Sequence, residues 1–322
     1  MRRAALVFLL LLTASKAAPD GAALQREIDR LDAALKAIPA ADLPNEVQGA
    51  IEPNRQLLDR ARKASSPEYR LYRLRDAFVG VETLAFVARE KASSESVDAF
   101  ARLWSARRAR FEAKPARPRG TLLQRALMES ASTRAERLFR ASLPYSKASA
   151  PWSGVYYLGE AEANLRFREF VQSIAAGDGE KSPSLAALAA ALDSVERDTL
   201  QFFAGDVTNQ AVIPVSARLK EARELLDAHR LDGAALLLVE ARLALTRRGG
   251  KASGGLENPP YVSHGTSIAA LLESWADDEP SPMKEKIRSD VVPFYASLLL
   301  PAAAARKAPA AVTVTLVRWP YT

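Results

Sequence analysis

The sequence predicts an all-α fold of antiparallel helical hairpins, layered as a multi-helix bundle or a short α-solenoid. Apolar residues recur every three to four positions, beginning with Leu24, Ile28, Leu31 and Leu35. Three Ser-Pro pairs mark helix starts, because serine caps a helix and proline fits its first turn. These pairs begin at Ser66, Ser182 and Ser281. Period-two alternation, which is typical of a strand, occurs only near the C-terminus.

The composition sets the scale of the fold. A chain of 322 residues with 48% apolar content can bury one large helical core or two smaller ones. We expect an all-helical domain over residues 18–300, with a possible sub-boundary near 114–120 or 177–183. The chain lacks cysteine, which excludes disulfides, a lipoprotein anchor and a cysteine nucleophile. The chain contains no run of 18 or more apolar residues, so the sequence predicts no transmembrane segment.

The N-terminus reads as a secretory signal peptide over residues 1–17. Arg2 and Arg3 form a charged region, residues 4–14 are apolar, and Ser15-Lys16-Ala17 is a small-x-small cleavage site. The alternative, an N-terminal membrane anchor, requires a longer apolar core. We therefore expect export to the periplasm or the medium.

Charge and composition restrict the partners. Cleavage removes Arg2, Arg3 and Lys16 and no acid, which lowers the net charge from +7 to +4. This excess does not predict nucleic-acid binding, but it suits a protein partner or an anionic envelope component. Helices rich in Ala and Arg and poor in Lys are typical of a high-GC bacterial genome. The oligomeric state stays open.

The first half of the chain predicts helices separated by prolines. We expect them over residues 22–38, 55–64, 67–91, from 93 or 94 to the loop at 114–120, and over 121–143. Pro39, Pro44 and Pro53 are expected to break the chain, and Pro144 to open a connection that ends at Ser153.

Residues 151–174 predict the helix around which the others are arranged. Tyr156, Ala163 and Phe167 share one face at helical spacing, and Leu158 and Ala161 lie on the opposite side. A surface helix has one apolar stripe, so this one should be packed between other helices. Four polar residues are expected to separate its two apolar sides, namely Glu162, Arg166, Glu169 and Ser173.

The second half predicts a helix over 183–204 and a helical hairpin over 216–245. The hairpin resembles a tetratricopeptide repeat in the small-large-small spacing of Ala234, Leu238 and Ala241. It lacks that repeat's Trp, Leu-Gly and Tyr positions and has no second copy, which indicates generic hairpin packing.

The end of the chain predicts two further helices and an extended tail. The helices are expected to begin near Thr266 and at Ser281, and Pro293 should kink or end the second one. Residues 301–322 read as an Ala/Pro-rich connector and a strand-like tail, which either docks on the helices or offers an edge to another chain.

Two glutamates occupy apolar helix faces. Glu160 lies between Tyr156 and Phe167, and Glu82 is the only ionisable residue in the strongly apolar second half, residues 78–88, of another helix. If they met, two buried carboxylates would raise a pKa and could bind a cation or transfer protons. The alternative is that an arginine or a tyrosine hydroxyl neutralises each one. Three polar residues accompany Glu160 on its helix as further candidates for a ligand site, namely Tyr157, Asn164 and Arg168.

A basic and aromatic stretch is the second candidate surface. Trp104 and Phe111 alternate with Arg107, Arg108 and Arg110. Such a stretch can hold an acidic polymer or lipid headgroups. The alternative is that the aromatic rings point inward and the arginines are solvated.

The remaining motifs are weak. With His229 and His264 as its only histidines, the chain predicts no metal site, and we expect no cofactor. His264 lies among hydroxyl residues that a helix cap explains equally well, and the glycine-rich loop at 249–255 does not match a phosphate-binding loop.

These observations favour an exported helical binding or scaffold protein without catalytic activity. The alternative is a small-ligand binder or an enzyme with a partly buried acidic pocket around Glu160 and Glu82. A binding scaffold should have an exposed apolar or basic concavity. An enzyme should have a closed pocket where Glu160, Tyr157 and another polar group converge.

Overall fold

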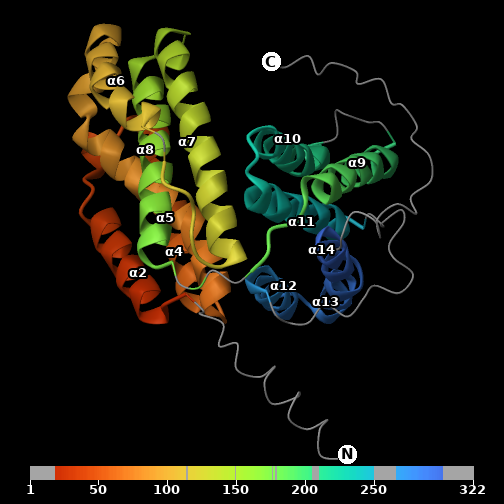
Figure 1. Ribbon diagram of the computed structural model, residues 1–322. Coiled ribbons are helices and arrows are strands. Elements are labelled where there is room, and N and C mark those ends of the chain that lie inside the picture. The colour runs from red at the N-terminus through yellow and green to blue at the C-terminus, as the bar shows by residue number, and fades with distance from the viewer. Residues whose placement is uncertain are drawn as a thin grey trace, which may run out of the picture.

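A computed structural model describes most of the chain as a multi-helix bundle (Figure 1). The described residues are 19–113, 115–148, 150–175, 177, 180–204, 210–249 and 266–299. Within these ranges every regular element is a helix, so the predicted all-α fold is confirmed. The same residues contain no helix that combines the length and the hydropathy needed to cross a membrane.

The helices of the first half are α2 (Gly21–Lys36), η1 (Ala40–Asp42), α3 (Asn45–Gln48), α4 (Ile51–Lys63), α5 (Pro67–Arg89), η2 (Lys91–Ser94), α6 (Val97–Glu112), α7 (Leu122–Ala148) and α8 (Pro151–Ser173). Those of the second half are α9 (Leu185–Phe202), η3 (Gln210–Val212), α10 (Ile213–Asp227), α11 (Leu231–Arg247), α12 (Ser267–Asp277), α13 (Ser281–Lys286), η4 (Ile287–Val291) and α14 (Val292–Leu298).

The helices of the first half, α2 to α8, form a first group, and those of the second half, α9 to α14, form a second group. Helix α8 lies at the centre of the first group, as predicted. It forms a hairpin with α7 on one side and packs on α5 on the other (Figure 1). Two glycines allow these close approaches. A Cβ atom at Gly159 would lie 2.8 Å from the Phe86 ring of α5, and one at Gly154 would lie 2.5 Å from the Cβ atom of Ser146 in α7. Helices α2 and α4 cover α5, and α6 lies along α7.

The second group packs on the first mainly through α11. Every residue of α11 from Asp232 to Thr246 is buried, because the helix lies between α7, α9 and α10. Helix α10 completes the predicted hairpin with α11, and α12 packs against α5 and α7. One continuous hydrophobic core runs through both groups. The sub-boundary near 177–183 stays a prediction.

Glu180, in the connection between α8 and α9, joins the two groups. Its carboxylate accepts hydrogen bonds from the backbone N–H of Leu122, at 2.5 Å, and of Ser267, at 2.7 Å. These two residues begin α7 and α12. A carboxylate suits this position because unpaired N–H groups and the positive end of the dipole meet at a helix N-terminus.

Two of the helix boundaries predicted from prolines are wrong. Pro144 lies inside α7, which continues past it to Ala148. Pro53 lies in the first turn of α4, where its missing N–H breaks no helical hydrogen bond. Pro293 does perturb the last helix. It follows η4, which is a turn of π-helix.

Several sequence predictions lie outside the described residues. They concern the signal peptide at 1–17, the glycine-rich loop beyond Gly249, His264 and the tail at 301–322.

Candidate functional site

Glu82 is held in an ion-paired cluster. Its side chain is only 6% exposed, and its two carboxylate oxygens accept hydrogen bonds from Arg30 of α2, at 2.7 Å, and Arg166 of α8, at 2.6 Å. Arg30 also bonds to Glu27. Both oxygens of Glu82 are therefore occupied, and the group ties three helices together.

Glu160 lies on the α7 side of α8 and is half-buried. Burial raises the pKa of Glu160, and the guanidinium groups of Arg134 and Arg137 in α7 oppose this effect. Both arginines bond to other acids, Arg134 to Glu221 at 2.6 Å and Arg137 to Glu224 at 2.9 Å. Glu160 forms none of the ion pairs found among the described residues. The structure therefore does not bring Glu82 and Glu160 together.

The other predicted residues of α8 have separate environments. Asn164 is buried and donates a hydrogen bond to the backbone oxygen of Glu160, at 2.8 Å. Arg168 is also buried and donates to the carbonyl oxygen of Ala116, and burial lowers its pKa. Tyr157 lies at the other end of the helix, where its ring stacks on Tyr145 with 4.4 Å between the centroids. Each of these three residues therefore contacts a different partner.

In the basic and aromatic stretch of α6, the rings pack against neighbouring helices and the arginines form ion pairs with acids. Trp104 stacks on Phe139 of α7, with ring centroids 4.6 Å apart. Three arginines bond to nearby acids. The pairs are Arg107–Glu90 at 3.2 Å, Arg108–Glu112 at 2.5 Å and Arg110–Glu162 at 2.7 Å. This arrangement matches the alternative in which the rings are structural.

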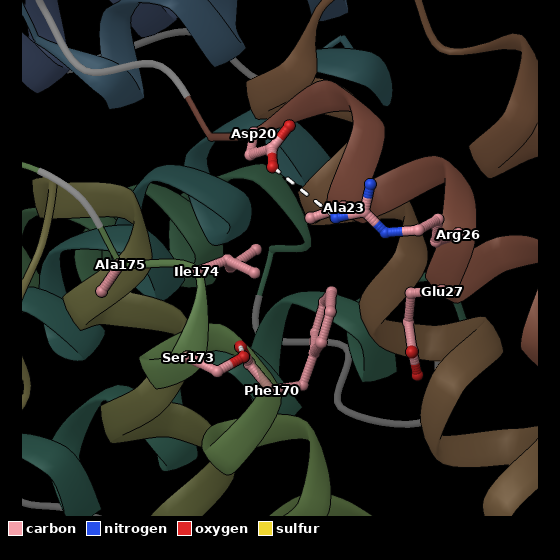
Figure 2. A pocket seen from close by; sticks show the side chains of 8 residues that line it. All are labelled: Asp20, Ala23, Arg26, Glu27, Phe170, Ser173, Ile174 and Ala175. Carbon is pink, nitrogen blue, oxygen red and sulfur yellow. Dashed lines mark hydrogen bonds and ion pairs between the residues drawn. The ribbon is translucent and has the colours of Figure 1, made fainter.

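One surface cavity lies between the start of α2 and the end of α8 (Figure 2). Its volume is about 530 Å³, and Phe170 and Ile174 supply its apolar wall. Its charged residues are already engaged. Asp20 caps α2 by accepting a hydrogen bond from Ala22 N–H, at 2.9 Å, and Glu27 bonds to Arg30. This cavity therefore presents few free polar groups to a ligand.

A second cavity is lined by aromatic rings, and we call it the aromatic pocket. Its volume is about 390 Å³, within the range of small-molecule sites. It lies where α3 approaches the end of α7 and the start of α8. Its lining residues are Glu46, Val47, Ala50, Tyr145, Trp152, Ser153, Tyr156 and Tyr157.

The rings of the aromatic pocket form a corner. Tyr156 and Tyr157 are almost perpendicular, with an interplanar angle of 88° and 6.2 Å between centroids. Burial and the negative charge of Glu160 raise the pKa of Tyr156. Burial, the Tyr145 hydroxyl and Glu160 raise the pKa of Tyr157. Glu160 therefore acts electrostatically on the pocket, although it is not one of its lining residues.

The sequence predicted only part of this pocket. Tyr157 was a candidate, and Glu160 was identified beside it, but Tyr145, Trp152, Tyr156 and Glu46 were missed as site residues. A signal was present. Residues 145–157 contain four of the twelve tryptophan and tyrosine residues of a chain with four Trp and eight Tyr. Glu46 comes from a distant segment, and only the folded chain places it there.

The described residues contain no group of three or more histidine, aspartate or glutamate side chains arranged to hold a metal ion. Within the described part of the chain, the aromatic pocket therefore remains as a candidate site for a small molecule. No protein-family model, curated protein or solved structure matches the sequence significantly.

Proposed function

We propose that this chain is an exported helical binding protein that holds a small ligand in the aromatic pocket without chemically changing it. The observation that carries this proposal is the convergence of Tyr145, Trp152, Tyr156 and Tyr157 on one open cavity. Aromatic rings supply large apolar contact areas with few rotatable bonds, and tyrosine and tryptophan add polar edges that orient a ligand.

The arrangement of the acids supports binding over catalysis. General acid–base catalysis needs a group within hydrogen-bond reach of the reacting atom, usually with a partner that tunes it. Glu82 is bonded to two arginines, and neither Glu82 nor Glu160 is among the described residues that line the pocket. The pocket lining offers Glu46, Ser153 and three tyrosine hydroxyls, none of which is hydrogen-bonded to a histidine or lysine among the described residues.

The proposal includes export of the protein from the cytoplasm. Its support is the order of a charged, an apolar and a small-residue segment over residues 1–17. A binding protein that acts outside the cytoplasm and lacks disulfides must rely on its core. The continuous hydrophobic core and the interhelical ion pairs suit this requirement.

A fragment screen tests the binding function. Ligand-observed NMR with a mixed library of cationic, neutral and anionic fragments is compared between the wild-type protein and Trp152→Ala. We expect a set of fragments to bind the wild type and to lose their signal with the variant. Circular dichroism verifies that the variant remains helical. Tyr156→Ala is a second variant of the pocket. If no fragment loses its signal in either variant, the pocket is not a ligand site and the proposal fails.

A further inference from the structure

The aromatic pocket has an uneven distribution of charge. Glu46 is its only ionisable lining residue apart from the tyrosines, and it forms none of the ion pairs or side-chain hydrogen bonds found among the described residues. Glu160 adds negative charge behind Tyr156 and Tyr157. Arginine and lysine are absent from the described residues of the lining, although the chain has 45 of them and a net charge of +7.

Arginine covers aromatic rings elsewhere in the protein. Four rings outside the pocket have a guanidinium group within 6 Å of their centroids, namely Tyr69, Tyr72, Phe78 and Phe86. Among the described residues no arginine or lysine lies over Tyr145, Trp152, Tyr156 or Tyr157 in this way. The rings of the pocket thus retain ring faces that no cation of the chain covers.

From these observations we infer that the aromatic pocket binds a small organic cation with an alkylated ammonium group. This inference rests on the proposed binding function and specifies its ligand class. The negative face of an aromatic ring attracts a cation, and an alkylated ammonium group is easier to desolvate than a bare one. The rings of Trp152, Tyr156 and Tyr157 line the cavity that such a group would enter, and Glu46 supplies the opposite charge.

One feature of the pocket opposes a cation. Trp152 and Ser153 lie in the first turn of α8, whose positive end carries a partial charge of about +0.5. The carboxylate of Glu46 carries a full negative charge, and Glu160 contributes further negative charge. Glu46 also lies in the first turn of α3, where it offsets the positive end of that short helix. The balance therefore favours a cation.

Choline is the probe that tests this inference by isothermal titration calorimetry. Its neutral carbon isostere, with a tert-butyl group in place of the trimethylammonium group, has the same shape without the charge. The carboxylate with the same tert-butyl group is the anionic probe. We expect choline to bind about tenfold more tightly than the neutral isostere, the size of a partly desolvated cation–π interaction.

Two variants that each remove one negative charge test whether Glu46 causes the preference for choline. Glu46→Gln should weaken choline binding several-fold and leave binding of the neutral isostere unchanged, because it removes charge and preserves shape. Glu285→Gln is the matched control. It removes the same charge from an exposed position on α13, in the second group of helices, and should bind choline like the wild type.

Each result has a defined meaning. Equal binding of choline and the neutral isostere, with both lost in Trp152→Ala, overturns the ligand class and retains the binding function. Tighter binding of the carboxylate also overturns the ligand class. If none of the three probes binds, the inference is wrong, and the fragment screen decides separately whether the pocket binds any ligand.

Discussion

Arg242 of α11 and Asp290 of η4 form a buried ion pair that fixes the second group of helices. The Arg242 side chain is 1% exposed, and its Nε donates to both carboxylate oxygens of Asp290, at 3.1 Å each. Its Nη1 donates to Asp198 of α9 at 2.7 Å, and Thr246 also bonds to Asp290. One guanidinium group therefore joins α9, α11 and the π-helical turn.

Replacing Arg242 by methionine should strongly destabilise the protein. The change removes the buried guanidinium group that bonds to both Asp198 and Asp290, and breaking a buried pair in this way costs about 3–5 kcal/mol. Urea unfolding followed by circular dichroism measures the free energy of unfolding. Arg247→Met is the control on the same helix. Its side chain is 40% exposed and pairs with Glu279, so its loss should cost at most about 1 kcal/mol. Equal effects of the two variants would show that Arg242 is not buried.

The sequence predicted the fold class and the central helix because both depend on the period of the apolar residues. The burial of α8 on two sides followed from apolar residues on opposite sides of residues 151–174. The helical hairpin of α10 and α11 followed in the same way. These features need no knowledge of which helices meet.

The sequence did not predict which polar residues are buried. Glu162 was expected on a polar strip, but it is only 2% exposed and bonds to Arg110 of α6. Glu160 was expected in the apolar face, but it is half-buried without an ion pair among the described residues. A helix packed between several others has no single solvent side, so a polar residue is buried wherever another helix supplies its partner. Arg110 is 52 residues from Glu162, and periodicity cannot show such a contact.

Glu129 of α7 should make stability decrease as the pH rises from about 4.5 to about 7. Burial raises the pKa of Glu129 to about 7 from an ordinary value of 4.5, and the charge of Asp232 adds to this effect. In this range the folded protein binds a proton that the unfolded chain has lost, so raising the pH favours unfolding. The contribution is present in full below about pH 4.5 and is lost above about pH 7, with a size of roughly 3 kcal/mol at most.

Melting temperatures between pH 4.5 and 8 test this prediction. Glu129→Gln should flatten the decline and melt at a higher temperature than the wild type at pH 8. The control Glu285→Gln, on an exposed part of α13, should keep the wild-type profile. A Glu129→Gln profile parallel to that of the wild type would mean that another group causes any pH dependence.

Export predicts a shorter mature chain. Cleavage near Ala17 removes Arg2, Arg3 and Lys16, and the protein recovered from the envelope fraction or medium should lack them. Intact-mass spectrometry of the purified protein measures the N-terminus directly. Arg2→Glu with Arg3→Glu removes the positive charge before the apolar segment and should leave the uncleaved chain in the cytoplasm. A mature protein that still begins at Met1 would contradict the proposed export.

Glu160→Gln should separate the function of the acid from its effect on stability. The carboxylate has no ion-pair partner among the described residues, and Arg134 and Arg137 bond to Glu221 and Glu224. The substitution therefore leaves no buried cation unpaired. Burial raises the pKa of Glu160, so the folded protein disfavours its charged form. At pH 8 we expect the glutamine variant to be as stable as the wild type or more stable, by urea unfolding.

The same variant should bind choline more weakly, because the negative charge behind Tyr156 and Tyr157 is lost. Glu160→Leu should lose choline affinity to a similar extent, since both variants remove the charge and neither changes a lining residue. A loss of stability in Glu160→Gln of about 3 kcal/mol or more would instead identify Glu160 as the partner of a buried cation. Unchanged stability together with unchanged choline affinity would show that the acid has no electrostatic effect on the pocket.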